Sequence, residues 1–239
     1  MRLDILITER KLVKSRNVAI DLIKKGFVKV AGEIITKAAK DYLDLPDLKI
    51  EILEQPKYVG RGGLKLEKAL TEFKIIPTDL ICLDVGSSTG GFTDCLLQHG
   101  AKKVYAVDVG TDQLDETLKN NPQVISLEQT DIRNIKNLDE KIDLAVIDVS
   151  FISLEAILPA TVNLLKKEGK IIALVKPQFE TPKEAKNKNG IVKTAEIREQ
   201  VLENIKNYCQ KIGLKILGKT DSPILGGSGN KEYLILLQK

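Results

Sequence analysis

The stretch Leu83-Asp84-Val85-Gly86-Ser87-Ser88-Thr89-Gly90-Gly91-Phe92-Thr93-Asp94 decides the fold of this 239-residue chain. An apolar strand runs into a turn rich in glycine and serine, and a helix follows. Glycine lets the backbone turn tightly and lets a ligand approach without a Cβ in the way. The spacing is Gly-x-x-x-Gly-Gly, unlike the Gly-x-Gly-x-x-Gly of dinucleotide folds, and it lacks the Lys-Ser/Thr pair of a P-loop. The stretch therefore predicts a ligand-binding turn at the end of a buried strand.

Outward from this turn, apolar strands alternate with amphipathic helices. This pattern predicts an α/β, Rossmann-like domain with a mostly parallel seven-stranded sheet and helices on both faces. The expected strands are Leu80–Val85, Lys103–Val107, Val124–Ser126, Leu144–Ile147, Ile171–Val175, Lys215–Thr220 and Tyr233–Leu237. The expected helices are Leu64–Phe73, Phe92–His99, Leu114–Leu118, Leu154–Lys166 and Ala195–Ile212. The last two strands have only a glycine-rich loop between them, so we expect an antiparallel hairpin at one edge. That is the architecture of S-adenosylmethionine-dependent methyltransferases.

The N-terminal part of the chain has a different composition. A boundary near Pro56–Gly63 predicts a small α+β domain at residues 1–59 and the larger domain at residues 60–239. Two helices are expected, at Leu3–Arg10 and Arg16–Lys25, with short strands after them. Residues 1–40 carry ten Lys and Arg against four Asp and Glu, whereas the whole chain has a net charge of only +4. The excess indicates a polyanion-binding surface, although charge alone equally fits an ordinary solvated surface.

Several classes of protein are disfavoured by composition. The chain has three cysteines, widely spaced and without a CxxC, so we expect neither disulfides nor a metal site. The N-terminus lacks an apolar signal core, and no apolar run approaches the ~18 residues of a membrane helix. We therefore expect a cytoplasmic protein, monomeric and without a membrane association.

Three acids follow successive strands and suit a cationic ligand. Asp84, Asp108 and Asp131 are expected at strand ends, where such sheets bind ligands, although any one of them could instead be a helix N-cap. S-adenosylmethionine carries a sulfonium and an amino group, and Asp108 would face its ribose and Asp131 its adenine. The predicted cofactor residues are Asp84, Gly86, Ser87, Ser88, Thr89, Gly90, Gly91, Phe92, Asp108, Val109, Asp131 and Ile132.

Four further charged residues fall around the same edge: Lys65, Asp148, Lys176 and Glu232. Lys176 follows five apolar strand residues and precedes Pro177, an improbable place for a solvated charge. A ribose hydroxyl is a poor nucleophile, so methyl transfer to it needs alignment and removal of its proton. An amine serves as the base only when a neighbouring cation or burial makes it easier to deprotonate.

The larger domain resembles the FtsJ-like ribose 2′-O-methyltransferases, and the whole chain resembles the TlyA family of rRNA methyltransferases, also labelled hemolysins. The shared strings are Arg61-Gly-Gly-Leu-Lys-Leu66, Asp148-Val-Ser-Phe151, Val175-Lys-Pro-Gln-Phe-Glu180 and Gly229-Asn-Lys-Glu-Tyr233. The resemblance implies a Lys-Asp-Lys-Glu tetrad on Lys65, Asp148, Lys176 and Glu232. It implies that Lys176 accepts the proton, that Lys65 eases its deprotonation, and that the two acids orient the pair.

The N-terminal part resembles the small RNA-binding domain named after ribosomal protein S-four. Such a domain sets basic residues against structured RNA and reads phosphates and shape. The resemblance implies ribosomal RNA or assembled ribosomal subunits as the partner, with cytidines as the family's targets. The expected RNA contacts are Arg2, Lys11, Ser15, Arg16, Lys24, Lys25 and Arg61.

One position departs from the family, and other readings remain open. Tyr58 stands in the linker where some members have tryptophan, which puts in doubt how strongly RNA docking couples to cofactor binding here. The alternatives are a membrane-active hemolysin, a dinucleotide-dependent oxidoreductase, and an RNA-binding protein with an inactive methyltransferase domain. The 4% aromatic content disfavours the hemolysin. The glycine spacing disfavours the oxidoreductase, and the intact tetrad disfavours the inactive methyltransferase domain.

Overall fold

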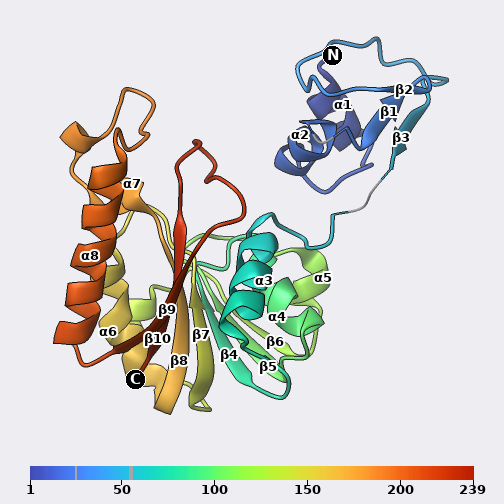
Figure 1. Ribbon diagram of the computed structural model, residues 1–239. Coiled ribbons are helices and arrows are strands. Elements are labelled where there is room, and N and C mark those ends of the chain that lie inside the picture. The colour runs from blue at the N-terminus through green and yellow to red at the C-terminus, as the bar shows by residue number, and fades with distance from the viewer. Residues whose placement is uncertain (25, 54–55) are drawn as a thin grey trace. The chain divides into compact units, whose positions relative to one another are not determined.

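The computed structural model describes residues 1–24, 26–53 and 56–239 and divides them into two compact units, Met1–Arg61 and Gly62–Lys239 (Figure 1). We call them unit 1 and unit 2. Each unit has its own hydrophobic core. Lys25, which we predicted at the end of a helix and in contact with RNA, lies outside the described residues.

Unit 1 packs two helices on a three-stranded antiparallel sheet of order β2-β1-β3. Its elements are α1 (Leu3–Glu9), α2 (Arg16–Lys24), β1 (Val28–Val30), β2 (Glu33–Ile34) and β3 (Ile50–Ile52). Ser15 caps α2, because its Oγ accepts a hydrogen bond from the Val18 N–H at 3.4 Å. After α2 the chain turns at Gly26, whose φ of +77° favours glycine.

A buried carboxylate joins the two helices of unit 1. Asp4 is fully buried, and its oxygens accept hydrogen bonds from Arg2 Nε at 3.0 Å and Arg16 Nε at 2.6 Å. Burial raises the pKa of Asp4, but the hydrogen bonds from Arg2 and Arg16 outweigh it and hold the pKa below its ordinary value. The side chains of both arginines stay about half exposed.

Unit 2 is built on a seven-stranded sheet of order β6-β5-β4-β7-β8-β10-β9. The strands are β4 (Ile81–Val85), β5 (Lys103–Val107), β6 (Val124–Leu127), β7 (Ile142–Ile147), β8 (Leu165–Val175), β9 (Lys215–Asp221) and β10 (Tyr233–Gln238). The first five are mutually parallel, and β10 pairs antiparallel with both β8 and β9. The predicted sheet and its antiparallel edge hairpin are confirmed.

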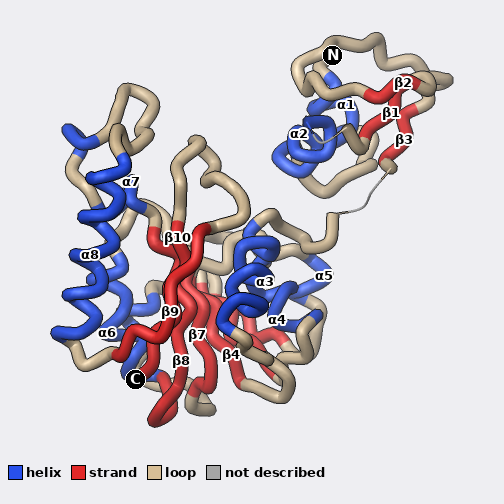
Figure 2. Tube along the Cα trace, viewed as in Figure 1, coloured by secondary structure: helices blue, strands red, loops and turns tan. Residues whose placement is uncertain are grey.

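Helices cover both faces of this sheet (Figure 2). On one face, α3 (Gly62–Phe73) packs against α4 (Gly91–Gln98), with the short α5 (Glu116–Lys119) beside β6. On the other face, α6 (Leu154–Leu164) packs against α8 (Ala195–Lys211). The short α7 (Pro177–Glu180) and the 3-10 turns η1 (Ile132–Asn134) and η2 (Lys183–Ala185) lie in the connecting loops. Within the described part of the chain, no helix is long and apolar enough to cross a membrane.

Two predicted boundaries were wrong. The helix predicted to end at Lys166 stops at Leu164, because Leu165 already pairs with Ile142 and begins β8, six residues earlier than predicted. Asp131 was expected to end a strand, but β6 ends at Leu127 and Asp131 caps η1 instead. In the first case strand pairing overrode the local apolar pattern, and in the second a local cap formed where a strand end was expected.

The Asp4 cluster yields a stability prediction. Replacement of Asp4 by Asn leaves both arginines without their buried counter-charge, so unit 1 should lose about 1–2 kcal/mol of unfolding free energy at pH 7. Since the folded pKa of Asp4 is lowered, its contribution is complete above the unfolded value of ~3.9 and disappears as the pH falls through the folded value. Hydrogen exchange of α1 and α2 in the full chain measures the loss. Glu9→Gln, an exposed neutralisation on the same helix, is the control. Equal protection in both variants would contradict the prediction.

Candidate active site

Two adjoining pockets lie at the carboxyl edge of the parallel strands in unit 2. The first has a volume of about 480 Å³ and is bounded by the glycine turn after β4 and the loops after β5 and β6. The second has a volume of about 650 Å³ and contains all four members of the predicted tetrad. Asp148, Ser150 and Phe151 line both pockets, so a ligand in one lies next to a ligand in the other.

The glycine turn is held tightly against the loop after β7. Gly86 has a φ of +84°, and a Cβ placed on it would lie 2.7 Å from the backbone oxygen of Asp148. The turn is fixed on its other side because the N–H groups of Gly86 and Ser87 both donate to the Val107 oxygen. Only glycine fits this position, which explains the first residue of the motif.

The wall beside β5 is organised by two carboxylates. Asp108 accepts hydrogen bonds from the N–H of Ser88 at 2.8 Å and of Gly110 at 2.7 Å, one on each oxygen. Glu128, which the sequence analysis did not single out, accepts from three consecutive backbone N–H groups in the loop at 112–114. These hydrogen bonds lower the pKa of Glu128, the bond from Leu114 most strongly. Each Asp108 oxygen keeps a second lone pair for a ligand hydroxyl.

The far end of the first pocket is lined by Asp131 and Ile132. Asp131 is paired with Arg133, whose Nη2 lies 2.6 Å from Asp131 Oδ2. Ile132 is buried, whereas Val109 is 72% exposed at the pocket wall. This combination of an acid and aliphatic side chains suits the polar edge and the faces of a planar base.

Asp84 lies in β4 and is completely buried. Its Oδ2 accepts a hydrogen bond from Thr93 Oγ1 at 2.7 Å, while its Oδ1 has no hydrogen-bond partner among the described residues. Burial raises the pKa of Asp84 to about 7, with a further contribution from the nearby charge of Asp148. A cation bound close by would favour its ionised form.

The predicted tetrad forms two ion pairs. Lys65 Nζ donates to Glu232 Oε2 at 2.7 Å, and Lys176 Nζ lies 2.6 Å from Asp148 Oδ1. The two lysines are each only 8% exposed, and Glu232 is 4% exposed. Lys176 also donates to Ser150 Oγ at 2.9 Å, a contact that the sequence analysis did not predict.

Aromatic and amide side chains complete the second pocket. Phe151 is 91% exposed and has a φ of +64°, a strained conformation for a bulky residue. Its ring lies 4.9 Å from the ring of Phe179, centroid to centroid. Gln178 Nε2 donates to Glu232 Oε1 at 3.1 Å. The strings around Asp148 and Lys176 contain these residues, so the signal was present in the sequence without an assigned role.

The structure brings some predicted cofactor residues together at the first pocket and places others behind it. The pocket is lined by Gly86, Ser88, Asp108, Val109, Asp131 and Ile132. The remaining predicted residues lie in β4, in the turn or in the first turn of α4: Asp84, Ser87, Thr89, Gly90, Gly91 and Phe92. The described residues contain no His, Cys, Asp and Glu cluster able to hold a metal ion.

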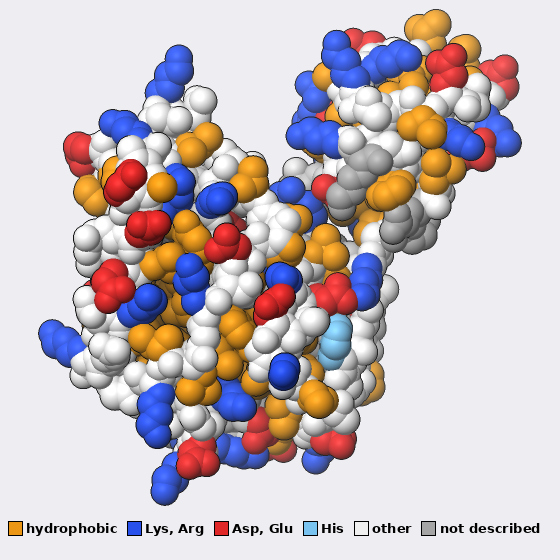
Figure 3. Space-filling model, in the orientation of Figure 1, with side chains coloured by type: hydrophobic (Ala, Val, Ile, Leu, Met, Phe, Trp, Pro, Cys, Tyr) orange, Lys and Arg blue, Asp and Glu red, His pale blue; other side chains and the backbone are white. Residues whose placement is uncertain are grey.

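The predicted RNA contacts in unit 1 lie mostly at the surface. Lys11, Arg16 and Lys24 are exposed, and Arg2 is tied to Asp4 beside Arg16. Lys and Arg side chains gather along one side of unit 1 (Figure 3). Arg61, the last residue of unit 1, is also exposed.

The glycine turn yields a binding prediction. Gly86→Ala should lower the affinity for S-adenosylhomocysteine at least tenfold, because its Cβ would push the turn off the Asp148 backbone. Gly213→Ala is the matched control, since Gly213 has a similar φ of +82° with nothing within 4 Å of its added Cβ. Both variants carry the same backbone strain of about 1 kcal/mol. Calorimetric titration distinguishes them, and equal affinities would remove the turn from the binding site.

Comparison with known proteins identifies the family of this chain. Residues 58–239 match the FtsJ-like methyltransferase family, and residues 1–41 match the S4 domain. Hemolysin A of Brachyspira hyodysenteriae is 43% identical over 98% of both chains. The 16S/23S rRNA (cytidine-2′-O)-methyltransferase TlyA of Mycobacterium tuberculosis is 38% identical over 99% of this chain and 89% of its own length. A solved structure from Streptococcus thermophilus is 43% identical, covers 100% of this chain and 88% of its own, and superposes with a TM-score of 0.80. The chain therefore belongs to the FtsJ-like methyltransferase family and carries an S4 domain at its N-terminus.

Proposed function

We propose that this protein transfers a methyl group from S-adenosylmethionine to a ribose 2′-hydroxyl of cytidine in ribosomal RNA, and that it works in the cytoplasm. The observation that carries the proposal is the pair of ion pairs, Lys65–Glu232 and Lys176–Asp148, in a pocket that shares a wall with the glycine-turn pocket. A full-length relative at 38% identity has this activity in its name.

The first pocket fits the cofactor. Its glycine turn leaves room where any Cβ would collide, and Asp108 has lone pairs free for two ribose hydroxyls. Asp84, buried below the turn with an unpartnered Oδ1, suits a cationic ligand. When bound, the cofactor supplies an electrophilic methyl group on its sulfonium. Asp131 would reach a base edge once Arg133 releases it.

The second pocket supplies the acid–base chemistry. We assign Lys176 as the proton acceptor because it is buried, faces the shared wall and is fixed by Asp148 and Ser150. Lys176 must first give up a proton of its own, and its acceptance of the hydroxyl proton then makes the ribose oxygen a better nucleophile. Lys65 is the neighbouring cation, and Glu232 holds it in place.

The size and lining of the second pocket suit one nucleotide turned out of its RNA. A volume of about 650 Å³ accommodates a nucleotide, and enzymes that modify a buried position turn the target out of its stack. The exposed ring of Phe151, in contact with Phe179, offers a stacking surface for the base. Unit 1 then contributes the phosphate contacts that hold the rRNA, through Arg2, Arg16 and Lys24.

The decisive experiment maps 2′-O-methyl marks on rRNA incubated with the protein and labelled S-adenosylmethionine. The wild-type protein should add a mark at a cytidine. Lys176→Ala should lower the rate at least a thousandfold while changing the affinity for S-adenosylhomocysteine less than threefold, because Lys176 touches the acceptor rather than the cofactor. A wild-type protein that adds no mark to either subunit would overturn the proposed function. A Lys176→Ala variant with most of its activity would overturn only the assignment of the base.

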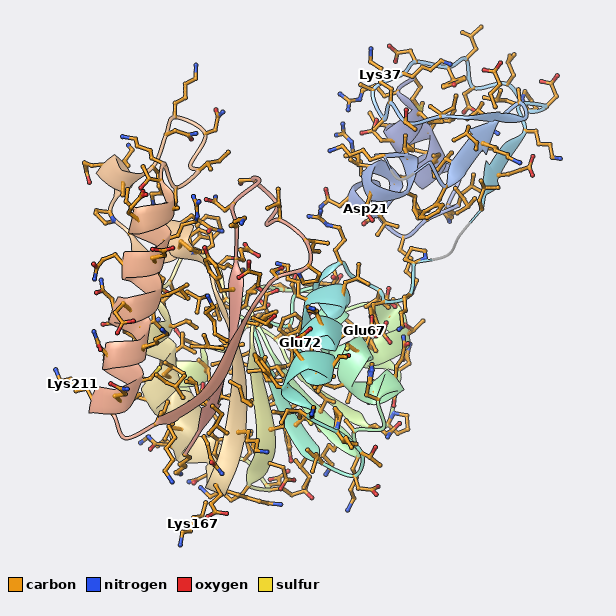
Figure 4. The ribbon with its side chains drawn as sticks, viewed as in Figure 1. Asp21, Lys37, Glu67, Glu72, Lys167 and Lys211 are labelled. Atoms are coloured by element: carbon orange, nitrogen blue, oxygen red, sulfur yellow. The ribbon has the colours of Figure 1, made fainter. Side chains whose placement is uncertain are left out.

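Reversal of charge in unit 1 tests the RNA contacts. Lys11→Glu with Lys24→Glu should weaken rRNA binding at least tenfold and reduce its salt dependence, because each lost phosphate contact removes counterion release. Arg16 is left unchanged because it holds the buried Asp4. Affinity for S-adenosylhomocysteine should not change. Lys167→Glu with Lys211→Glu is the matched control, since these lysines lie at the other end of unit 2 from the long loops that enclose the second pocket (Figure 4). Equal RNA affinity in the two double variants would assign unit 1 another role.

A further inference from the structure

Gln178 has an amide whose orientation is fixed by the ion pair beside it. Glu232 accepts from Lys65 on Oε2 and from Gln178 Nε2 on Oε1. An ionised carboxylate can only accept hydrogen bonds, so the NH₂ group of Gln178 must face Glu232 and its carbonyl must point the other way. The Lys65–Glu232 pair therefore determines which end of the amide faces Glu232 and which end is left for another partner.

The backbone that carries Gln178 is also anchored. Pro177 fixes the first turn of α7, and the Glu180 carboxylate at its end accepts from Ser153 Oγ at 2.6 Å and from the Leu154 N–H at 2.9 Å. Lys186 Nζ donates to the backbone oxygen of Gln178 at 2.8 Å. Burial raises the pKa of Glu180, while its hydrogen bonds oppose that rise. These contacts hold the Gln178 side chain in one place.

The carbonyl oxygen of Gln178 is left without a donor. Oε1 is buried and has no hydrogen-bond partner among the described residues, yet Gln178 lines the second pocket. An unsatisfied buried acceptor destabilises the folded chain, so such a group in a residue that lines a binding pocket is a candidate partner for a ligand donor. It adjoins Phe179, whose ring contacts the exposed Phe151. A base stacked on these rings is one ligand whose edge can supply such a donor.

We propose that Gln178 Oε1 accepts a hydrogen bond from the exocyclic amino group of the target cytosine and so selects cytidine over uridine. This inference rests on the proposed function and assigns its base selectivity to one side chain. Cytosine carries an amino donor at position 4, where uracil carries a carbonyl acceptor. If uracil took the same place, its carbonyl oxygen would face Gln178 Oε1. Both atoms are acceptors, so no hydrogen bond would form between them. A site built around one hydrogen bond discriminates strongly against an analogue that cannot make it.

The test compares the rates of methylation for cytidine and uridine at one position. Ribosomal subunits are prepared with the mapped target nucleotide as cytidine or as uridine, and kcat/KM is measured for both. The wild-type protein should prefer cytidine at least tenfold. Gln178→Met, which keeps the length of the side chain but removes both polar ends, should bring the ratio to within about threefold of unity. Gln210→Met, on the exposed surface of α8, should leave both rates unchanged.

The ratio of kcat/KM for cytidine to that for uridine distinguishes two roles of Gln178, selection of the base and positioning of Glu232. If Gln178 only positioned Glu232, Gln178→Met would slow cytidine and uridine by the same factor, and an unchanged ratio would overturn the proposal. A mapped target other than cytidine would contradict the inference while leaving rRNA methylation intact, whereas absence of any mark would contradict the proposed function itself.

Discussion

The buried ion pair between Lys65 and Glu232 is the interaction on which the site depends. It joins the first helix of unit 2 to the residue just before its last strand, positions 167 residues apart in sequence. Burial of two charges costs several kcal/mol per ion, and only close geometry with further hydrogen bonds offsets that cost. Here the separation is 2.7 Å, and Gln178 supplies an additional donor. Such a pair contributes little net stability, but it fixes the positions of the groups around it.

The glycine turn imposes a second constraint on the same groups. Gly86 packs directly on the backbone of Asp148, whose carboxylate pairs with Lys176. The turn that shapes the first pocket therefore also helps to position this carboxylate. The two pockets share Asp148, Ser150 and Phe151 for this reason. A change in the turn is therefore transmitted to the second pocket through one peptide unit rather than through a long network.

The sequence predicted the sheet because its strands are nearly continuous apolar runs separated by helices of clear periodicity. It predicted Lys176 as a buried group from the apolar strand before it and Pro177 after it. The sequence did not predict which acid pairs with which lysine. Lys65 contacts Glu232 because β10 lies between β8 and β9 in the sheet, and no sequence pattern indicates that position. The role of Glu128 could not be predicted for a similar reason. Its three hydrogen bonds come from the backbone of a loop, and the hydrophobic periodicity of the sequence does not predict loop conformation. Loop geometry, rather than strand pattern, decides these contacts.

Two departures from local structural rules lie at the carboxyl edge of the sheet. Two of the helices that begin there have good caps, Asp115 before α5 and Ser153 before α6. At the edge, Phe151 adopts a left-handed backbone with its ring 91% exposed, and Asp84 is a buried carboxylate whose pKa is raised to about 7 by burial. Each departure costs free energy in the folded chain. In the proposed complex a stacked base would cover the exposed ring of Phe151, and a cation in the first pocket would favour the ionised form of Asp84 behind it. Binding of cofactor and nucleotide should therefore stabilise this edge more than any other part of unit 2, because the groups that they satisfy are the ones that the fold leaves unsatisfied.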